Sequence, residues 1–299
     1  MIFQMFFSNL AIQFLVRTLP IVTILGYAPT SMAETRYALV VGNGSYNSSP
    51  LSSPAFDADA MALKLQELGY DVTIRKNLTK DLFFLEVKAF GARLRANKAP
   101  GLFYYSGHGN QINGRNYLIP VDADIRSEED IEHRFGIRVD YIVATMESAE
   151  SRPNVVVLDA CRNNPFEKSF KDGAVGMTNM TPAAGMLIAF AAAPGRTAIQ
   201  VPNDLSIYTR ELVKRIGEVH EPGISVQELF GDVANAVFDT TRGKQQPHIE
   251  TAPGIPKTFL LRRIVNPEVA QHQEPRKPSN AACNVANPPL VPCFFKESK

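Results

Sequence analysis

The chain has 299 residues, of which 45% are hydrophobic and 20% are charged, so it can form a sizeable core and is not disordered throughout. Lysine and arginine number 31 against 30 aspartate and glutamate residues, and this net charge of +1 gives no electrostatic case for a dedicated nucleic-acid binder. With three cysteines, the chain is neither a disulfide scaffold nor a protein with several zinc sites.

Residues 1–33 differ from the rest of the chain. They hold no acidic residue and one basic residue, Arg17, which is followed by an apolar run from Leu19 to Ala28 and by small residues at Ser31 and Ala33. This pattern predicts a signal peptide that is cleaved after Ala33, and therefore a periplasmic or secreted protein without stable membrane association. An uncleaved membrane anchor is the competing interpretation, although no uninterrupted run of about 18 apolar residues is present.

The C-terminal segment 264–299 holds six prolines and shows no helical or strand period, which predicts an extended tail. In an exported protein its two cysteines, Cys283 and Cys293, are expected to close a small loop through a disulfide. In a cytosolic chain they would be two unpaired thiols. Residues 34–263, between the signal peptide and the tail, are expected to form one domain.

Strands and helices alternate along this domain. Apolar runs predict buried strands, and apolar residues at helical spacing predict the helices between them. The predicted order is strand 37–42, helix 58–68, strand 71–75, helix 79–94, strand 101–105, a loop rich in Gly, Asn and Asp, helix 141–146, strand 154–158, strand 186–193, helix 205–219, helix 226–237 and strand 257–261. Continuously apolar strands alternating with helices predict an α/β domain with a largely parallel sheet between two helical layers.

Two strand ends carry the candidate chemistry, because the sites of such sheets gather where strands end. The strand 101–105 runs into SGHG with His108, and the strand 154–158 runs into DAC with Cys161. If the two strands are adjacent and parallel, the imidazole can take the thiol proton and leave a thiolate nucleophile. The backbone N–H groups of Gly109 and Cys161 are then candidate donors to an oxyanion.

Each of these residues also has an ordinary structural interpretation. A cysteine after a buried strand is often a small core residue, and a histidine between glycines is often on the surface. The glycines on either side of His108 are expected to allow a sharp turn. The joint position of His108 and Cys161 at two strand ends, about 50 residues apart, favours the catalytic interpretation.

At these residues the chain resembles the caspase-like cysteine peptidases, and in particular their bacterial branch of metacaspase-like or orthocaspase-like proteins. The resemblance extends from Tyr37 to about Leu261 and rests on the motifs YALVVGN, FYYSGHG, NYLIPVDADI, VVVLDACRNNPF and AFAAAPG. It implies a three-layer α/β/α caspase-haemoglobinase-like fold with a mainly parallel sheet of about six strands. It also implies a catalytic dyad of His108 and Cys161 that works without a cofactor.

The resemblance further implies which residue the substrate carries at P1, immediately before the cleaved bond. Caspases cleave after Asp and have basic pockets, whereas metacaspases cleave after Arg or Lys and have acidic pockets. Asp159 stands two positions before Cys161, where the caspase motif has Gln, and a carboxylate there attracts a basic P1 side chain. The resemblance adds Asp57, with Asp59 as the alternative, and Ser106 as a third polar pocket position.

Both aspartates have structural alternatives as well. Asp57 is also placed where a helix begins, as an N-cap or first-turn acid. Asp159 is also interpretable as a strand-end carboxylate that binds local backbone N–H groups.

Other features of the family are incomplete in this sequence. The segment Asn163–Gly185, where caspases are split, is short, and its Lys168 and Lys171 are either self-cleavage sites or solvated charges. The acids between 122 and 130 lack the spacing of a calcium loop, and no histidine pair stands at helical spacing, so no bound metal is expected.

The sequence therefore predicts a cysteine endopeptidase that uses a His–Cys dyad and acts on proteins or peptides with Arg or Lys at P1. The alternative is a binding or signalling module with the caspase fold and little or no turnover. A thiol-redox protein is a third interpretation, against which stands the absence of a C-x-x-C motif.

Overall fold

The structure is a computed structural model that describes residues 35–161, 177–194, 196, 198–199, 201–219, 223–255 and 260–261. The predicted signal peptide, the tail with Cys283 and Cys293, and the linker residues Lys168 and Lys171 lie outside these ranges, as does the side chain of Cys161. The expectations for those parts of the chain stay predictions.

A path of six strands forms the centre of the described domain. Its order is β2 (Tyr70–Lys76), β1 (Arg36–Gly42), β3 (Gly101–Ile112), β6 (Asn154–Cys161), β7 (Met186–Phe190) and β9 (His248–Thr251). The first five strands are parallel to one another, and β9 pairs antiparallel with β7. The predicted mainly parallel sheet of about six strands is confirmed.

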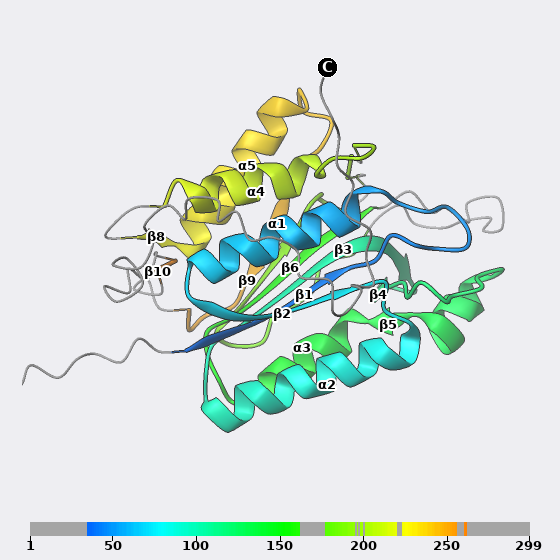
Figure 1. The fold of residues 1–299 in the computed structure, drawn as a ribbon, viewed down its shortest axis with the longest axis horizontal. Helices are drawn as coiled ribbons and strands as arrows, with labels where there is room; N and C mark the ends of the chain where they lie inside the picture. Colours follow the sequence, from blue (N-terminus) through cyan, green and yellow to red (C-terminus); the bar gives the residue numbers. More distant parts are fainter. Residues whose placement is uncertain are drawn as a thin grey trace, which may run out of the picture. The chain divides into compact units, whose positions relative to one another are not determined.

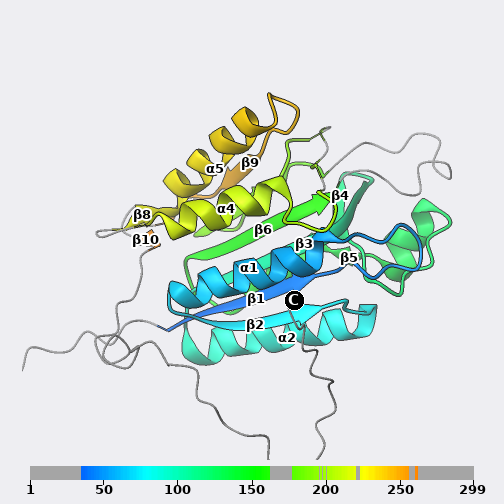
Figure 2. The same cartoon turned by 45° about the horizontal axis from the view of Figure 1, so that its top comes forward.

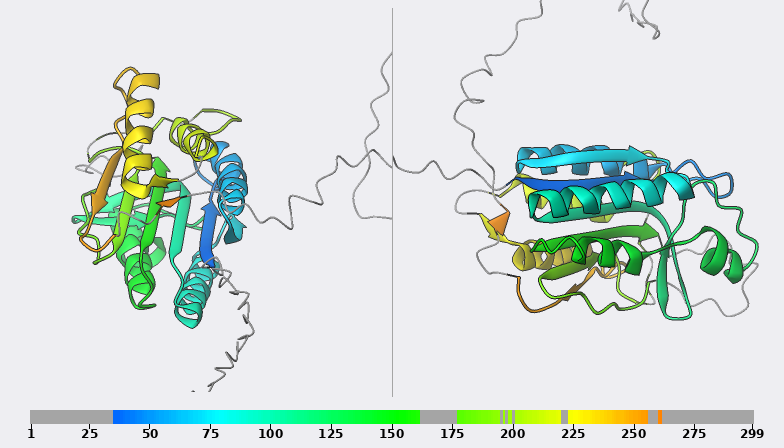
Figure 3. Two further views of the ribbon diagram at one scale, coloured as in Figure 1. Left: turned by 90° about the vertical axis from the view of Figure 1, so that its left-hand side faces the viewer. Right: turned by 90° about the horizontal axis from the view of Figure 1, so that it is seen from below.

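Helices cover both faces of this sheet (Figures 1 and 3). One face carries α1 (Ser53–Glu67), α4 (Ile207–Gly217) and α5 (Val226–Thr240), and the other carries α2 (Lys80–Asn97) and α3 (Val139–Glu147). Side chains of β3 alternate between the two layers, because successive residues of a strand point to opposite faces. Leu102 and Tyr104 enter the first core cluster, and Phe103 and Tyr105 enter the second.

β3 is longer than the sequence predicts. It continues through residues 106–112, where a loop was expected, and pairs antiparallel with β4 (Arg115–Leu118). The hairpin turns at Asn113 and Gly114, whose φ angles of 51° and 74° are those that an Asn-Gly turn of type I′ requires. The hairpin signal is present in the sequence, but the glycines and polar residues around it resemble a loop.

β4 also pairs antiparallel with β5 (Ile137–Arg138), which follows the π-helix η1 (Asp130–Phe135) in the chain. A small third core cluster lies under these elements and includes Tyr46 from the loop after β1.

The prediction that residues 257–261 close the sheet is wrong. β9 occupies that edge, whereas β10 (Leu260–Leu261) pairs with β8 (Ile224–Ser225) in a separate two-stranded sheet. β9 has the sequence HIET and its residues are half-buried or exposed. An edge strand with a single aliphatic residue gives no apolar run, so the sequence pattern does not reveal it.

A buried asparagine ties the loop after β1 to two other loops. Asn43 is fully buried, and its Oδ1 accepts a hydrogen bond from the Leu78 N–H at 2.9 Å. Its Nδ2 donates to the carbonyl oxygens of Leu78 at 3.4 Å and Ile119 at 3.2 Å. The start of this loop is therefore fixed against the segments that precede α2 and follow β4.

Within the ranges that the structure describes, no helix has both the length and the apolar composition needed to cross a bilayer.

We expect Asn43→Ala to lower the free energy of unfolding by about 1–3 kcal/mol, because the buried Leu78 N–H loses its acceptor. Asn97→Ala is the matched control, since Asn97 is exposed and bonds to the Arg93 carbonyl of its own helix; its effect should stay within about 0.5 kcal/mol. Urea unfolding followed by circular dichroism measures both. Equal unfolding midpoints for Asn43→Ala and the wild type would contradict the role given to Asn43.

Candidate active site

His108 and Cys161 occupy paired positions on neighbouring strands. β3 and β6 are neighbours in the sheet (Figure 2). Their parallel register matches Ser106 with Asp159 and His108 with Cys161. Both strands continue past their predicted ends, so the two motifs lie within the sheet and not in the loops that follow it. The backbone positions of the predicted base and nucleophile are therefore side by side.

The imidazole of His108 is buried, with 4% of the residue exposed. The loop after β1 provides its hydrogen-bond partner. Its Nε2 lies 2.7 Å from the carbonyl oxygen of Ser49. A carbonyl oxygen can only accept, so Nε2 carries the hydrogen of the neutral ring and Nδ1 carries the lone pair. Among the described residues, Nδ1 has no hydrogen-bond partner and is free to accept a proton.

Burial lowers the pKa of His108 below its ordinary value of 6.5, and the hydrogen bond to the Ser49 carbonyl acts in the opposite direction. The net lowering keeps the ring neutral at pH 7, which is the form that can act as a base.

Ser49 presents its carbonyl from an unusual backbone conformation. Its φ is +56°, in the left-handed region that non-glycine residues seldom adopt. Such conformations persist where the surrounding structure holds them, and they cluster at functional sites.

The glycines beside His108 lie in a strand and not in a sharp turn, and close packing constrains both of them. Gly107 also has a φ of +158°, which residues with a side chain rarely adopt. A Cβ added to Gly107 would lie 2.6 Å from the Tyr105 hydroxyl and 2.7 Å from the Tyr46 hydroxyl. A Cβ added to Gly109 would lie 2.8 Å from the Cβ of Ala160.

The two predicted oxyanion donors belong to the same strand pair. Gly109 follows His108 in β3 and is matched with Leu118 of β4, while Cys161 is the last residue of β6. Their backbone N–H groups therefore lie on neighbouring strands, and their role as oxyanion donors stays a prediction.

Asp57 and Asp159 meet in a buried polar cluster that also contains Ser106. Both aspartates are fully buried. Ser106 donates its hydroxyl hydrogen to Oδ2 of Asp57 at 2.8 Å. Ser206, the N-cap of α4, joins the two acids: its backbone N–H donates to Oδ1 of Asp57 at 2.8 Å, and its hydroxyl donates to Oδ2 of Asp159. All three predicted pocket residues are thus part of one cluster.

One carboxylate oxygen of this cluster has no hydrogen-bond donor among the described residues. Oδ2 of Asp159 also accepts from the Thr209 hydroxyl at 2.7 Å, and that hydroxyl in turn contacts the hydroxyl of Tyr104. Oδ1 of Asp159 is buried and has no hydrogen-bond partner among the described residues. A buried, unpartnered carboxylate oxygen is costly and needs an explanation.

Both carboxyl groups hold protons more tightly than usual. Burial, followed by repulsion from Asp159, raises the pKa of Asp57 to about 8. Burial also raises the pKa of Asp159, against the hydrogen bonds from Ser206 and Thr209. Among the ion pairs of the described residues, none joins either acid to a lysine, arginine or histidine.

The structure differs from the structural alternatives given for these two acids, an N-cap or first-turn acid for Asp57 and a ligand of local backbone N–H groups for Asp159. Because α1 begins at Ser53, Asp57 lies beyond its first turn and contacts β3. The side chains that bond to Asp159 are those of Ser206, the N-cap of α4, and Thr209 within α4, and both are distant from Asp159 in the sequence. Asp59 is exposed and pairs with Lys76 at 2.6 Å, so it is not part of the cluster.

Four contributors to the site were missed from the sequence: Tyr46, Ser49, Ser206 and Thr209. Ser206 precedes a helical pattern, and the N-cap rule would have marked it as a helix start. Its contact with Asp57 spans 149 positions, however, and no local pattern shows such a contact. Ser49 supplies a backbone carbonyl, which any residue type has.

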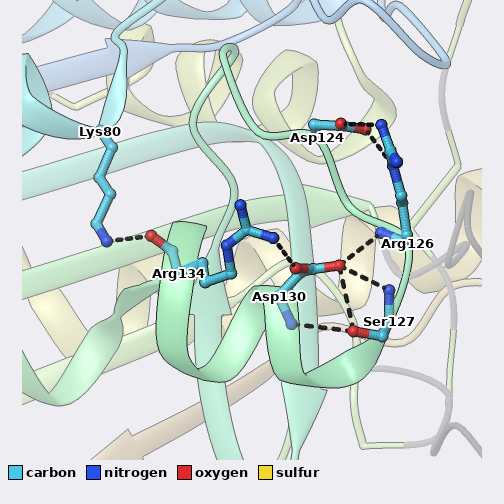
Figure 4. A network of polar contacts seen from close by, with 6 residues as sticks. All are labelled: Lys80, Asp124, Arg126, Ser127, Asp130 and Arg134. Carbon is cyan, nitrogen blue, oxygen red and sulfur yellow. Dashed lines mark hydrogen bonds and ion pairs between the residues drawn. The ribbon is translucent and has the colours of Figure 1, made fainter.

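Two acids of the segment 122–130, Asp124 and Asp130, form ion pairs with nearby arginines (Figure 4). Asp130 accepts from the Arg126 N–H at 3.0 Å and pairs with Arg134 at 2.8 Å, and Asp124 pairs with Arg126 at 2.6 Å. In the part of the chain that the structure describes, no group of three or more His, Cys, Asp or Glu residues is arranged to hold a metal ion.

Comparison with known proteins decides the family. A model of the caspase domain, peptidase family C14, matches residues 35–256. The chain belongs to the caspase domain family. Members of this family are cysteine endopeptidases, and the matched residues include His108 and Cys161. The expected caspase-haemoglobinase-like fold is confirmed.

Two relatives illustrate how this caspase domain compares with others. Mucosa-associated lymphoid tissue lymphoma translocation protein 1 of Homo sapiens is 26% identical over 227 residues, which are 74% of this chain and 26% of that protein. Caspase-1 of Sus scrofa is 30% identical over 137 residues, which are 43% of this chain and 31% of that protein. The matches thus span about a third or less of each relative's length.

We expect Asp57 to make the stability of this caspase domain depend on pH. With a pKa of about 8 when folded and an ordinary value of 3.8, Asp57 keeps a proton in the folded protein that the unfolded chain has lost. Its contribution to stability is therefore complete below about pH 4 and disappears as the pH rises through about 8. Asp57→Asn cannot titrate, so its stability relative to the wild type should rise over this range.

Urea unfolding at about pH 5 and about pH 8 measures this change. The exposed Asp59→Asn is the matched control from the same helix and should follow the wild type. A difference between Asp57→Asn and the wild type that is the same at both pH values would refute the expectation.

Proposed function

We propose that the protein is a cysteine endopeptidase in which His108 and Cys161 form the catalytic dyad. The observation that carries this proposal is their pairing on adjacent parallel strands, together with a neutral imidazole whose Nδ1 has no partner among the described residues. Membership of the caspase domain family supports the same reaction.

In the proposed reaction, Nδ1 of His108 takes the thiol proton of Cys161, and the thiolate attacks the carbonyl carbon of the scissile bond. The S–C bond forms as the carbonyl electron pair moves onto oxygen, and the N–H groups of Gly109 and Cys161 stabilise that oxyanion. The imidazolium then protonates the departing amine as the C–N bond breaks. Water hydrolyses the remaining thioester, with His108 again acting as the base.

Ser49 has a supporting role in this proposal. Its carbonyl accepts from Nε2 and so fixes the tautomer that leaves Nδ1 as the base. The same hydrogen bond stabilises the positive charge that the ring acquires when it takes the thiol proton, much as a third group orients the base in other nucleophile–base pairs.

We further propose that the enzyme prefers Arg or Lys at P1 and belongs with the metacaspase-like branch. Asp57 and Asp159 form a buried acidic pair, and among the described residues the pair has no cation and Oδ1 of Asp159 has no donor. A guanidinium or ammonium group would supply both the charge and the missing donor. An aspartate at P1 would bring a third carboxylate next to Asp57 and Asp159, which already repel each other.

Entry of such a side chain requires movement at the start of α4. Both aspartates are fully buried and Ser206 bonds to both, so a substrate cation must displace or share these hydrogen bonds. The guanidinium or ammonium group of the substrate would then replace the hydrogen-bond donors of Ser206 with charged donors.

Cys161→Ala should abolish hydrolysis of a fluorogenic peptide ending in Arg, because no nucleophile remains. His108→Ala should reduce kcat/KM by at least about 10²-fold, the usual scale for the loss of a general base. Circular dichroism and the urea midpoint of each variant establish that folding is intact. Full activity of Cys161→Ala would refute the dyad, and an inactive wild type would favour a binding or signalling module.

Asp159→Asn keeps the shape of the acidic pair and removes one charge. We expect kcat/KM for Arg-P1 peptides to fall by at least about 30-fold, because removing one partner of a buried charge pair costs about 2–5 kcal/mol. Asp59→Asn, an exposed aspartate of α1, should leave kcat/KM unchanged. Profiling with peptide libraries tests the preference itself: faster cleavage after Asp or after a large apolar residue would overturn it.

A further inference from the structure

We infer that Tyr46 is a positioning residue for His108, an inference that rests on the proposed catalytic role of His108. Tyr46 lies in the loop between β1 and α1 and is 8% exposed. Its contacts reach both the main chain and the ring of His108.

The hydroxyl of Tyr46 holds the main chain of His108. It accepts a hydrogen bond from the His108 N–H at 2.9 Å and donates to the Ile119 carbonyl at 3.2 Å. It also lies 3.2 Å from the Tyr105 hydroxyl. A backbone N–H in a sheet ordinarily bonds to the next strand, whereas this one bonds to a side chain from a loop 62 positions away.

The ring of Tyr46 packs against the imidazole. The two ring centroids are 4.4 Å apart, with the planes tilted by 47°. This packing excludes water from one side of His108 and contributes to the burial that lowers the pKa of the imidazole.

The same short loop therefore contacts the imidazole twice. Tyr46 packs on the ring, and Ser49, three residues further on, accepts from Nε2. The loop is closed on itself by the N–H groups of Tyr46 and Leu51, which both donate to the Gly44 carbonyl at 2.9 Å. With Asn43 anchoring its start, the loop has a defined shape, and the imidazole position follows from it.

Tyr105 is a matched control from the same buried cluster. Its hydroxyl donates to the carbonyl oxygen of His108 at 2.8 Å, but that oxygen also accepts from the Ile119 N–H at 3.0 Å. The phenol ring of Tyr105 belongs to the core under α2 and stacks on Phe83. Tyr105→Phe thus removes a hydroxyl of similar burial without removing a ring from the imidazole.

The first experiment separates the two contacts kinetically. Tyr46→Phe keeps the ring and removes the acceptor of the His108 N–H, and kcat should fall by about 10- to 100-fold with KM unchanged, because a small misplacement of the base has this effect. Tyr46→Leu removes the ring as well and should also move the acid limb of the kcat/KM profile to higher pH. Tyr105→Phe should lower the urea midpoint but leave that limb in place.

The second experiment does not depend on catalysis. In the full chain carrying Cys161→Ala, the His108 ring is titrated by NMR with and without Tyr46→Leu. We expect the His108 pKa to rise toward its ordinary value in the Tyr46→Leu protein and to stay constant with Tyr105→Phe.

An unchanged titration together with an unchanged kcat would overturn the inference. A shifted titration in a protein whose wild type hydrolyses no peptide would instead remove the proposed function and leave the contact between Tyr46 and His108 established.

Discussion

The register between β3 and β6 is the constraint on which the rest of the site depends. It matches His108 with Cys161 and, two residues earlier, Ser106 with Asp159, so one ladder of backbone hydrogen bonds aligns the proposed dyad and part of the acidic pair together. A slip by one residue would turn every side chain of one strand to the opposite face. Side chains from both faces of the two strands are packed in core clusters, so such a slip would disrupt the packing of both helical layers.

Around this strand pair, the first helical layer supplies a buried carboxyl group and hydrogen-bond donors, and the loop after β1 orients the imidazole. α1 contributes Asp57, and the N-cap of α4 bonds to both acids. The loop after β1 holds the imidazole through Tyr46 and the Ser49 carbonyl. The candidate site is therefore assembled from segments that meet only when the three layers are packed, and the two functions proposed for it, proton transfer and recognition of a cation, depend on different elements.

Much of this arrangement follows from local patterns in the sequence. Apolar runs and helical spacing predicted the layers, and the strand-end rule predicted that His108 and Cys161 would be neighbours. What could not be predicted depends on tertiary contacts. The edge strand β9 has one aliphatic residue, the extension of β3 is rich in glycine, and Ser206 meets Asp57 across 149 positions. The Ser49 carbonyl has no sequence signal, because every residue carries one.

The crowding around Gly107 and Gly109 limits how this segment can change. At either position a methyl group would come within 3 Å of a neighbouring atom, whether or not the protein has any activity. A library randomised over positions 107–109 and selected for folding alone would thus recover glycine at both ends. Under the proposed mechanism, histidine between them is required only when the same library is selected for activity, so the three-residue motif combines packing constraints at its two ends with the proposed base at its centre.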